Sequence, residues 1–201
     1  MFDLENLDIL LLQEVRMSSL QIENELTGFN AVVNIDHNNV SLPGTAIVWR
    51  KDIPVNDVIA LSPCRLQVAT VGPYVIINLY APSGSSKKHE RNIFYSQDVF
   101  TALHLHKELS IVIGGDYNCL LQPEDVENGF GFTQKNCPAL ANLVNVAGLH
   151  DAFRLLYPFK NEFTFFRSGC SPSRLDRFYV SSNIKNAVIN VNHITTLSDN
   201  C

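Results

Sequence analysis

A carboxylate and a carboxamide stand two positions apart at Asp116 and Asn118, directly after the run Ile-Val-Ile-Gly-Gly at 111–115. In a strand, residues i and i+2 share a face, so we expect these two side chains to point the same way. The glycines lack a Cβ and let another backbone or a ligand approach. This combination suits a phosphate or a metal-bound water better than it suits a core.

Other apolar runs also end on oxygen-bearing side chains. These residues are Glu14, Tyr80, Asp176 and Asp199. A single acid at a strand end is usually a turn former or a cap, but so many such ends together indicate a site. Oxygen donors without accompanying His or Cys favour Mg²⁺ or Mn²⁺ over zinc. A cation held by two carboxylates can polarise a phosphodiester, and a separate carboxylate such as Asp116 can take a proton from water.

Short strands must position these residues. Apolar and β-branched runs predict strands at 8–14, 31–33, 45–49, 66–71, 74–80 and 111–118, and three closing strands at 163–166, 174–180 and 187–194. The first run is continuously apolar, so we expect it to be buried on both faces. Residues 52–57 read as a turn between strands.

Helices are predicted at three places besides a short helical tail before residue 8. They cover about 21–26, 88–107 and 138–147, the last with Pro138 at its start and Gly148 after its end. Residues 120–133 are expected to form a long loop with three acids, Glu124, Asp125 and Glu127. About nine or ten strands with three helices and no internal repeat favour an α+β fold, a sandwich of two mixed sheets with helices outside.

Composition limits the alternatives. With 201 residues, 46% of them hydrophobic, the chain can bury one core, and we expect a single domain over 1–201. No apolar run is long enough to cross a bilayer, and the N-terminus lacks the basic start of a secretory signal. Five scattered cysteines fit neither a disulfide framework nor a zinc site. The formal net charge of −5 means that a bound polyanion would need a local basic rim or a cation.

Five short motifs resemble those of the endonuclease/exonuclease/phosphatase superfamily in order and spacing. They are Leu12-Gln13-Glu14, Asn78-Leu79-Tyr80-Ala81-Pro82, Gly114-Gly115-Asp116-Tyr117-Asn118, Ser173-Arg174-Leu175-Asp176 and Leu197-Ser198-Asp199. Within the superfamily, the segments 149–154 and 163–165 are most similar to the apurinic-like endonuclease domain of non-LTR (LINE-type) retrotransposons. The resemblance covers essentially the whole chain and implies a four-layered α/β/β/α sandwich of mainly antiparallel sheets.

The resemblance also implies roles for individual residues. Glu14 would be a metal ligand, and Asp199 would lie beside the Mg²⁺ or Mn²⁺ ion. Asp116 would align or deprotonate the attacking water. Asn118 and Tyr80 would hold the scissile phosphate, with further phosphate contacts from Thr164 and Ser173. Asp176 would orient a histidine directly after Asp199.

That histidine is replaced by Asn200, and the family's first strand, which carries an Asn, would precede Met1. An Asn side chain cannot carry the charge or shuttle the proton of an imidazole. Loss of a positioned acid–base group typically lowers a rate by roughly 10²- to 10⁴-fold. We therefore expect a domain that lacks its first and last strands and has weakened or lost activity.

Three functions remain open at this point. The first is an intracellular, nuclear or cytoplasmic DNA-nicking endonuclease, a monomer that contacts the phosphate backbone, acts beside a reverse-transcriptase domain of the same polyprotein and binds no membrane. The second is an RNA or small-molecule phosphodiesterase of the same superfamily. The third is a non-catalytic binding domain that kept the fold, which Asn200 favours.

Overall fold

The computed structural model describes residues 7–36, 38, 39 and 42–194. Its strands are β1 (Ile9–Val15), β2 (Phe29–Asn34), β3 (Gly44–Arg50), β4 (Val55–Ser62), β5 (Leu66–Val71), β6 (Tyr74–Tyr80), β7 (Ser110–Asp116), β8 (Leu149–Asp151) and β9 (Asp176–Ser181). Its α-helices are α1 (Ser19–Glu25), α2 (Lys88–Ile93), α3 (Phe100–Leu105), α4 (Phe132–Lys135), α5 (Pro138–Val146) and α6 (Ala152–Leu156). A π-helical segment, η3 (Phe94–Val99), joins α2 to α3, and 3-10 turns are η2 (Ser85–Lys87), η4 (Pro123–Asp125), η5 (Glu127–Gly129) and η6 (Lys185–Ala187).

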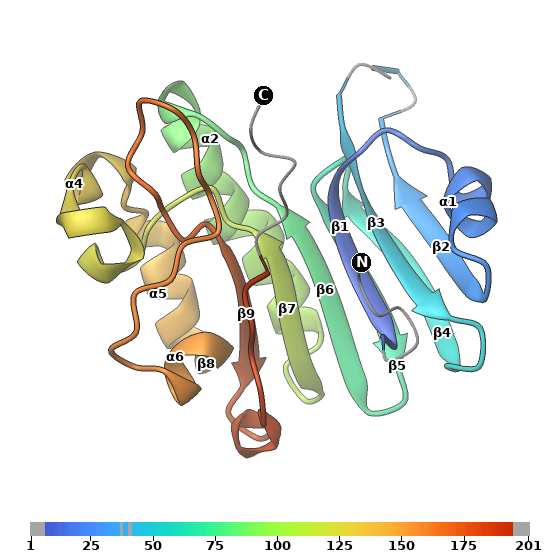
Figure 1. The fold of residues 1–201 in the computed structure, drawn as a ribbon. Helices are drawn as coiled ribbons and strands as arrows, with labels where there is room; N and C mark the ends of the chain where they lie inside the picture. The colour runs from blue at the N-terminus through green and yellow to red at the C-terminus, as the bar shows by residue number, and fades with distance from the viewer. Residues whose placement is uncertain (1–6, 37, 40–41, 195–201) are drawn as a thin grey trace.

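Two sheets pack face to face with helices on both outer sides, which confirms the predicted sandwich (Figure 1). One sheet has the strand order β1-β3-β2 and is antiparallel. The other has the order β4-β5-β6-β7-β9-β8, and only β6 and β7 run parallel in it. The helical run from α2 through η3 to α3 forms the crossover between these two parallel strands.

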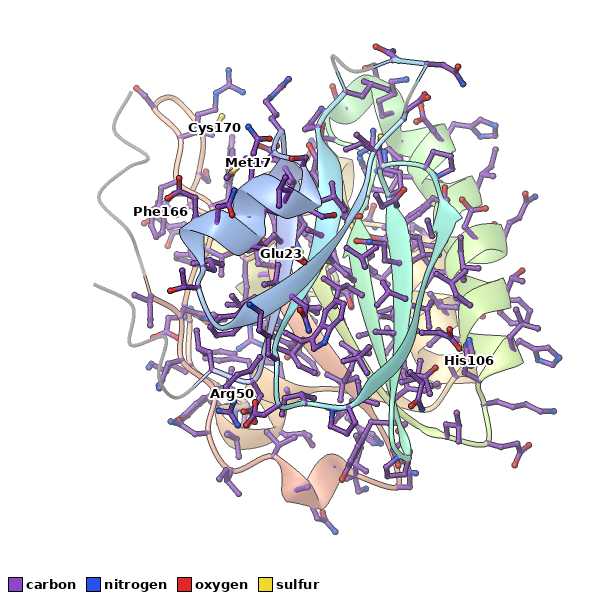
Figure 2. All side chains as sticks on the ribbon, turned by 90° about the vertical axis from the view of Figure 1, so that its right-hand side faces the viewer. Met17, Glu23, Arg50, His106, Phe166 and Cys170 are labelled. Carbon is purple, nitrogen blue, oxygen red and sulfur yellow. The ribbon has the colours of Figure 1, made fainter. Side chains whose placement is uncertain are left out.

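Each sheet has its own hydrophobic layer beneath a helix. Phe94, Val99 and Leu140 pack on the six-stranded sheet from the helices outside it. On the other side, Ile22 of α1 packs on the three-stranded sheet. The Glu23 carboxylate accepts a hydrogen bond from the N–H of Ala31 at 2.9 Å, which fastens α1 to β2 (Figure 2).

Buried amide side chains, Asn78 and Gln67 among them, join the sheets across the sandwich. Asn78 of β6 donates to the carbonyls of Leu12 at 3.0 Å and Ala46 at 2.9 Å, and accepts from Gln13 Nε2 at 2.7 Å. Gln67 of β5 donates to the carbonyl of Val32 at 3.0 Å. Because both amides are fully buried, losing either would leave carbonyls unpaired in the core. These bonds fix the end of β1 relative to the six-stranded sheet.

Some expectations for individual elements were wrong. The strand β1 is half-buried rather than covered on both faces, because it pairs only with β3 among the described residues. Residue 187 ends the turn η6 and residues 188–194 have no regular secondary structure, while residues 163–166 contribute only an isolated bridge at Phe165. The strand β4 begins at Val55, halfway through the region 52–57 that was read as a turn, and neither β4 nor β8 was predicted. Asp151 caps α6 by accepting from the N–H groups of Phe153 and Arg154, at 3.0 and 3.2 Å.

Candidate active site

Three predicted site residues lie in one row across the six-stranded sheet. Tyr80, the last residue of β6, is the register partner of Asp116 at the end of β7. Asp116 is in turn opposite Asp176, the first residue of β9. The structure therefore brings together residues that are up to 96 positions apart in the sequence.

Glu14 reaches this row from the other sheet. Its φ of 59° is in the left-handed region, and the register of β1 against β3 shifts between Gln13 and Val15. A bulge of this kind turns a side chain away from its regular direction, and bulges of this kind are common beside active sites. The Tyr80 hydroxyl donates to Glu14 Oε1 at 2.8 Å. The bulge and this bond place the Glu14 carboxylate beside the row.

Asn118 is bonded to Asp116 through both its backbone and its side chain. Its N–H donates to Asp116 Oδ1 at 2.8 Å, and its Nδ2 donates to Asp116 Oδ2 at 2.9 Å. The second hydrogen of Nδ2 is directed at the carbonyl of Ala81, also at 2.9 Å. A φ of 49° makes this compact turn possible, and Asn tolerates that conformation better than most residues. In this conformation Asn118 positions Asp116, and its contact with a phosphate remains a prediction.

The double glycine allows the strands to approach closely under the row. A Cβ built on Gly115, whose φ is 142°, would lie 1.9 Å from the carbonyl oxygen of Leu79. A Cβ on Gly114 would meet the ring of Phe178 at 2.3 Å. The glycines thus admit a neighbouring backbone and an aromatic ring, one of the two uses expected from the sequence.

The row opens onto a cleft of about 1410 Å³. Its walls include Glu14, Asp116, Asn118 and Asp176 from the strand ends. The loop with Phe165, Phe166, Arg167 and Cys170 also lines the cleft. Phe166 and Cys170 lie at the end of the molecule opposite Arg50 (Figure 2). The cleft is large enough for a segment of a polymer as well as for a small ligand.

The two predicted phosphate contacts differ in position. Thr164 lines the cleft, but its Oγ1 accepts from the N–H groups of Leu175 and Asp176, both at 3.0 Å. It therefore holds the start of β9. Ser173 is 1% exposed, and its Oγ donates to the carbonyl of Ser171 at 3.0 Å. In this conformation, its buried hydroxyl serves the loop and does not face the cleft.

The carboxylates of the row share a poorly solvated environment. Burial raises the pKa of Asp116 to about 7, and the charges of Asp176 and Glu14 add to the rise. Burial also raises the pKa of Asp176, against the opposing hydrogen bond from Thr164 and the charge of Arg177. A carboxyl with a pKa near 7 can exchange a proton with water at neutral pH, as a general base requires.

Behind the row lies a buried ionic cluster that the sequence did not reveal. The Asp125 carboxylate, read as one of three loop acids, accepts from Arg174 Nη2 at 2.9 Å, Arg177 Nη2 at 3.1 Å and Arg154 Nη2 at 3.1 Å. Asp151 accepts from Arg174 Nη2 at 2.7 Å. Arg174 and Arg177 flank Asp176 in the chain, so the cluster fixes the beginning of β9.

Two other residues that help to position the site were not predicted to do so. Gln13 and Asn78 belong to two of the family motifs, but no role was predicted for either. Their hydrogen bond couples the sheet of Glu14 to that of Asp116. The signal was present: Asn78 is an amide inside an otherwise apolar strand. Asp199 and Asn200 lie outside the described residues. Within the described part of the chain, no three His, Cys, Asp or Glu side chains are grouped closely enough to hold a metal ion, and no helix is long and apolar enough to span a membrane.

The sequence matches the Endonuclease/Exonuclease/phosphatase family over residues 2–199. The chain therefore belongs to this family. No curated protein matches the sequence significantly.

Solved structures show the same fold. A 3'-5' exonuclease (NExo) from Neisseria meningitidis superposes with a TM-score of 0.74 at 22% identity, over 92% of this chain and 81% of that one. An AP endonuclease from Archaeoglobus fulgidus gives 0.72 at 17% identity, over 90% and 79%. A 3' phosphatase form of NExo from Neisseria, bound to a product DNA hairpin, gives 0.72 at 21% identity, over 91% and 80%.

Proposed function

We propose that the chain is a metal-dependent phosphodiesterase acting on DNA, the endonuclease domain of a retrotransposon-type protein. The observation that carries this proposal is the convergence of Tyr80, Asp116 and Asp176 in one row, with Glu14 beside it, on a large cleft. The named activities of the structural neighbours, an exonuclease, an AP endonuclease and a 3' phosphatase, support phosphoester hydrolysis. The product DNA hairpin bound to one of them supports DNA as the substrate.

The donors at the row fit a hard divalent cation. They are carboxylate oxygens, and Asp176 and Glu14 lie close enough for their negative charges to add to the rise that burial causes in the pKa of Asp116. Glu14, together with Asp199, would hold Mg²⁺ or Mn²⁺. The ion would supply a Lewis acid that polarises the phosphodiester and stabilises the leaving oxygen.

The protein's own residues divide the remaining work. Asp116 accepts a proton from water as the water oxygen attacks phosphorus and the bond to the leaving oxygen breaks. Asn118 and the carbonyl of Ala81 hold Asp116 in place. Tyr80 keeps its proton because burial, followed by its bond to Glu14, raises its pKa. It therefore remains a donor to Glu14.

Asn200 limits the expected activity. In the proposed site Asp176 has no histidine to orient at that position, so protonation of the leaving oxygen loses its usual donor. This substitution supports a second candidate, a nucleic-acid-binding domain without catalysis. A reverse-transcriptase partner, a monomeric state and a nuclear or cytoplasmic location remain predictions.

Hydrolysis of supercoiled plasmid and of a soluble bis-nitrophenyl phosphodiester, each with Mg²⁺ and with EDTA, tests the proposal. We expect Mg²⁺-dependent nicking of plasmid and little hydrolysis of the soluble ester. Hydrolysis of the ester alone would favour a small-molecule phosphodiesterase. A melting temperature that Mg²⁺ leaves unchanged, with no cleavage of either substrate, would favour the binding domain.

A further inference from the structure

The cleft is lined by cations as well as by the acidic row, and we call the part of it at Arg91 and Lys135 its basic end. Arg91, Lys135 and Arg167 line the cleft together with the carboxylates of Glu14 and Asp116. The chain as a whole has a net charge of −5, so three cations on one cleft depart from the average surface. A cleft with an acidic and a basic end suits a ligand that carries more than one phosphate.

Arg91 is built into the wall at this end. It is 3% exposed, and its Nη1 donates to the carbonyls of Pro82 and Gly84. Its Nε is buried and has no hydrogen-bond partner among the residues that the structure describes. The carbonyl of Ala81, next to Pro82, accepts from the Asn118 side chain. By holding this loop, Arg91 therefore also supports the turn that positions Asp116. A buried guanidinium bonded only to neutral carbonyls is a positive charge without a counter-ion in these bonds.

Lys135 comes to the same place from the end of α4. Lys88 Nζ of α2 donates to Asn136 Oδ1 at 3.3 Å, and Cys137 Sγ donates to Asn92 Oδ1 at 3.2 Å. These bonds hold residues 136 and 137 against the helix that carries Arg91. The exposed Lys135 therefore extends from a fixed position beside the cleft.

The side chains of the row cannot supply these phosphate contacts as they stand. Both Nδ2 hydrogens of Asn118 are directed at Ala81 and Asp116, and the Tyr80 hydroxyl donates to Glu14. Positively charged donors are also the strongest phosphate ligands. The cations at the basic end are the groups in the cleft suited to a phosphate next to the reacting one.

We propose that Arg91 and Lys135 form a second phosphate subsite, which holds a backbone phosphate of DNA flanking the one at Asp116. This inference rests on the proposed function for its choice of DNA. Arg91 provides a fixed charge, and Lys135 provides an ammonium that can adjust to the strand. The subsite would act on affinity and would give no base preference.

Binding of a fluorescent DNA duplex in EDTA tests the subsite without cleavage. Anisotropy titrations at several salt concentrations would compare the parent chain with Lys135→Ala, Arg91→Gln and the double variant. We expect weaker binding for each single variant and a salt slope lower by about 0.9 for Lys135→Ala, the value for one phosphate contact. Because both side chains hold the same phosphate, their losses should be less than additive in the double variant.

The matched control is Lys185→Ala, which changes the net charge equally in the turn η6, beyond the far end of β9 from Asp176. It should bind as the parent does. If Lys135→Ala also binds as the parent does, or if the parent binds no DNA, the subsite is wrong. If circular dichroism shows that Arg91→Gln does not fold, the binding of Lys135→Ala alone tests the proposed subsite. Nicking in Mg²⁺ is measured separately, so absent nicking with altered binding rejects the catalytic proposal alone.

Discussion

Asp116 and Asp176 face each other as register partners on the neighbouring strands β7 and β9. Like charges opposite each other destabilise a sheet, and here burial adds to that cost. The fold keeps the pair because a buried ionic cluster fixes β9 from behind and the Asn118 turn fixes Asp116 from the front. Such a cost in stability is expected where a carboxylate is held ready for chemistry.

Replacing Asp116 with Asn should stabilise the chain in EDTA at pH 8. The pKa of Asp116 is about 7 in the folded state against 3.8 for the free side chain. The folded state therefore binds more protons in this window, and its stability falls as the pH rises from about 4 to 7. Since one pKa unit is about 1.4 kcal/mol, the gain at pH 8 should be roughly 2–4 kcal/mol.

Urea unfolding at pH 5 and pH 8 measures this effect, with the exposed Asp57→Asn of β4 as the control. The difference between parent and Asp116→Asn should be larger at pH 8. An equal difference at both values would contradict the assigned pKa.

The two glycines should differ in their tolerance of a methyl group. In Gly115→Ala the new Cβ would meet the backbone oxygen of Leu79 at a φ of 142°, so the strands must separate. We expect a loss well above 1 kcal/mol. In Gly114→Ala the Cβ meets the ring of Phe178, which is 47% exposed and can rotate away. Thermal unfolding of both variants checks the order; a greater loss for Gly114→Ala would show that backbone approach is not the reason for Gly115.

Removing Asp125 should be among the most damaging single substitutions. Asp125→Ala would leave three arginines without their shared acceptor, and breaking a buried ion pair costs about 3–5 kcal/mol. Glu90→Ala removes a carboxylate that pairs with the exposed Lys87 and should have little effect. Denaturant midpoints compare the two. Similar losses would mean that the cluster does not anchor β9.

Tyr80→Phe separates the role of the hydroxyl from that of the ring. The ring stays buried, and the loss of one hydrogen bond to Glu14 should cost about 1 kcal/mol. The larger effect should be a weaker binding of the cation, because the Glu14 carboxylate loses the hydrogen bond that orients it. The rise in melting temperature with Mg²⁺ should shrink in this variant. An unchanged rise would indicate that Glu14 does not depend on Tyr80.

The sequence predicted what depends on local pattern. The strands at 66–71 and 74–80 were predicted with their observed limits because an apolar run and a turn signal delimit each. The acids and amides at strand ends were also found, because each directly follows or ends an apolar run that predicts a strand. The helix over 88–107 was found as well, although it contains the π-helical turn η3.

What depends on distant contacts was missed. The strand β4 was missed although Val58-Ile59-Ala60-Leu61 is a short apolar run, because polar residues stand near the start of the strand and most of its positions are exposed. Asp125 appeared to be a loop acid because its three arginines are 29 to 52 positions away. The bulge at Glu14 and the Gln13–Asn78 bond arise only when the two sheets meet.

Nicking of supercoiled plasmid in Mg²⁺ by the parent chain, Asp116→Asn and Asn200→His tests the central claim most directly. We predict slow nicking by the parent, at least 10²-fold faster nicking by Asn200→His, and none by the double variant Asp116→Asn/Asn200→His. Full activity of the parent that Asn200→His does not raise, or activity that survives Asp116→Asn, would contradict it.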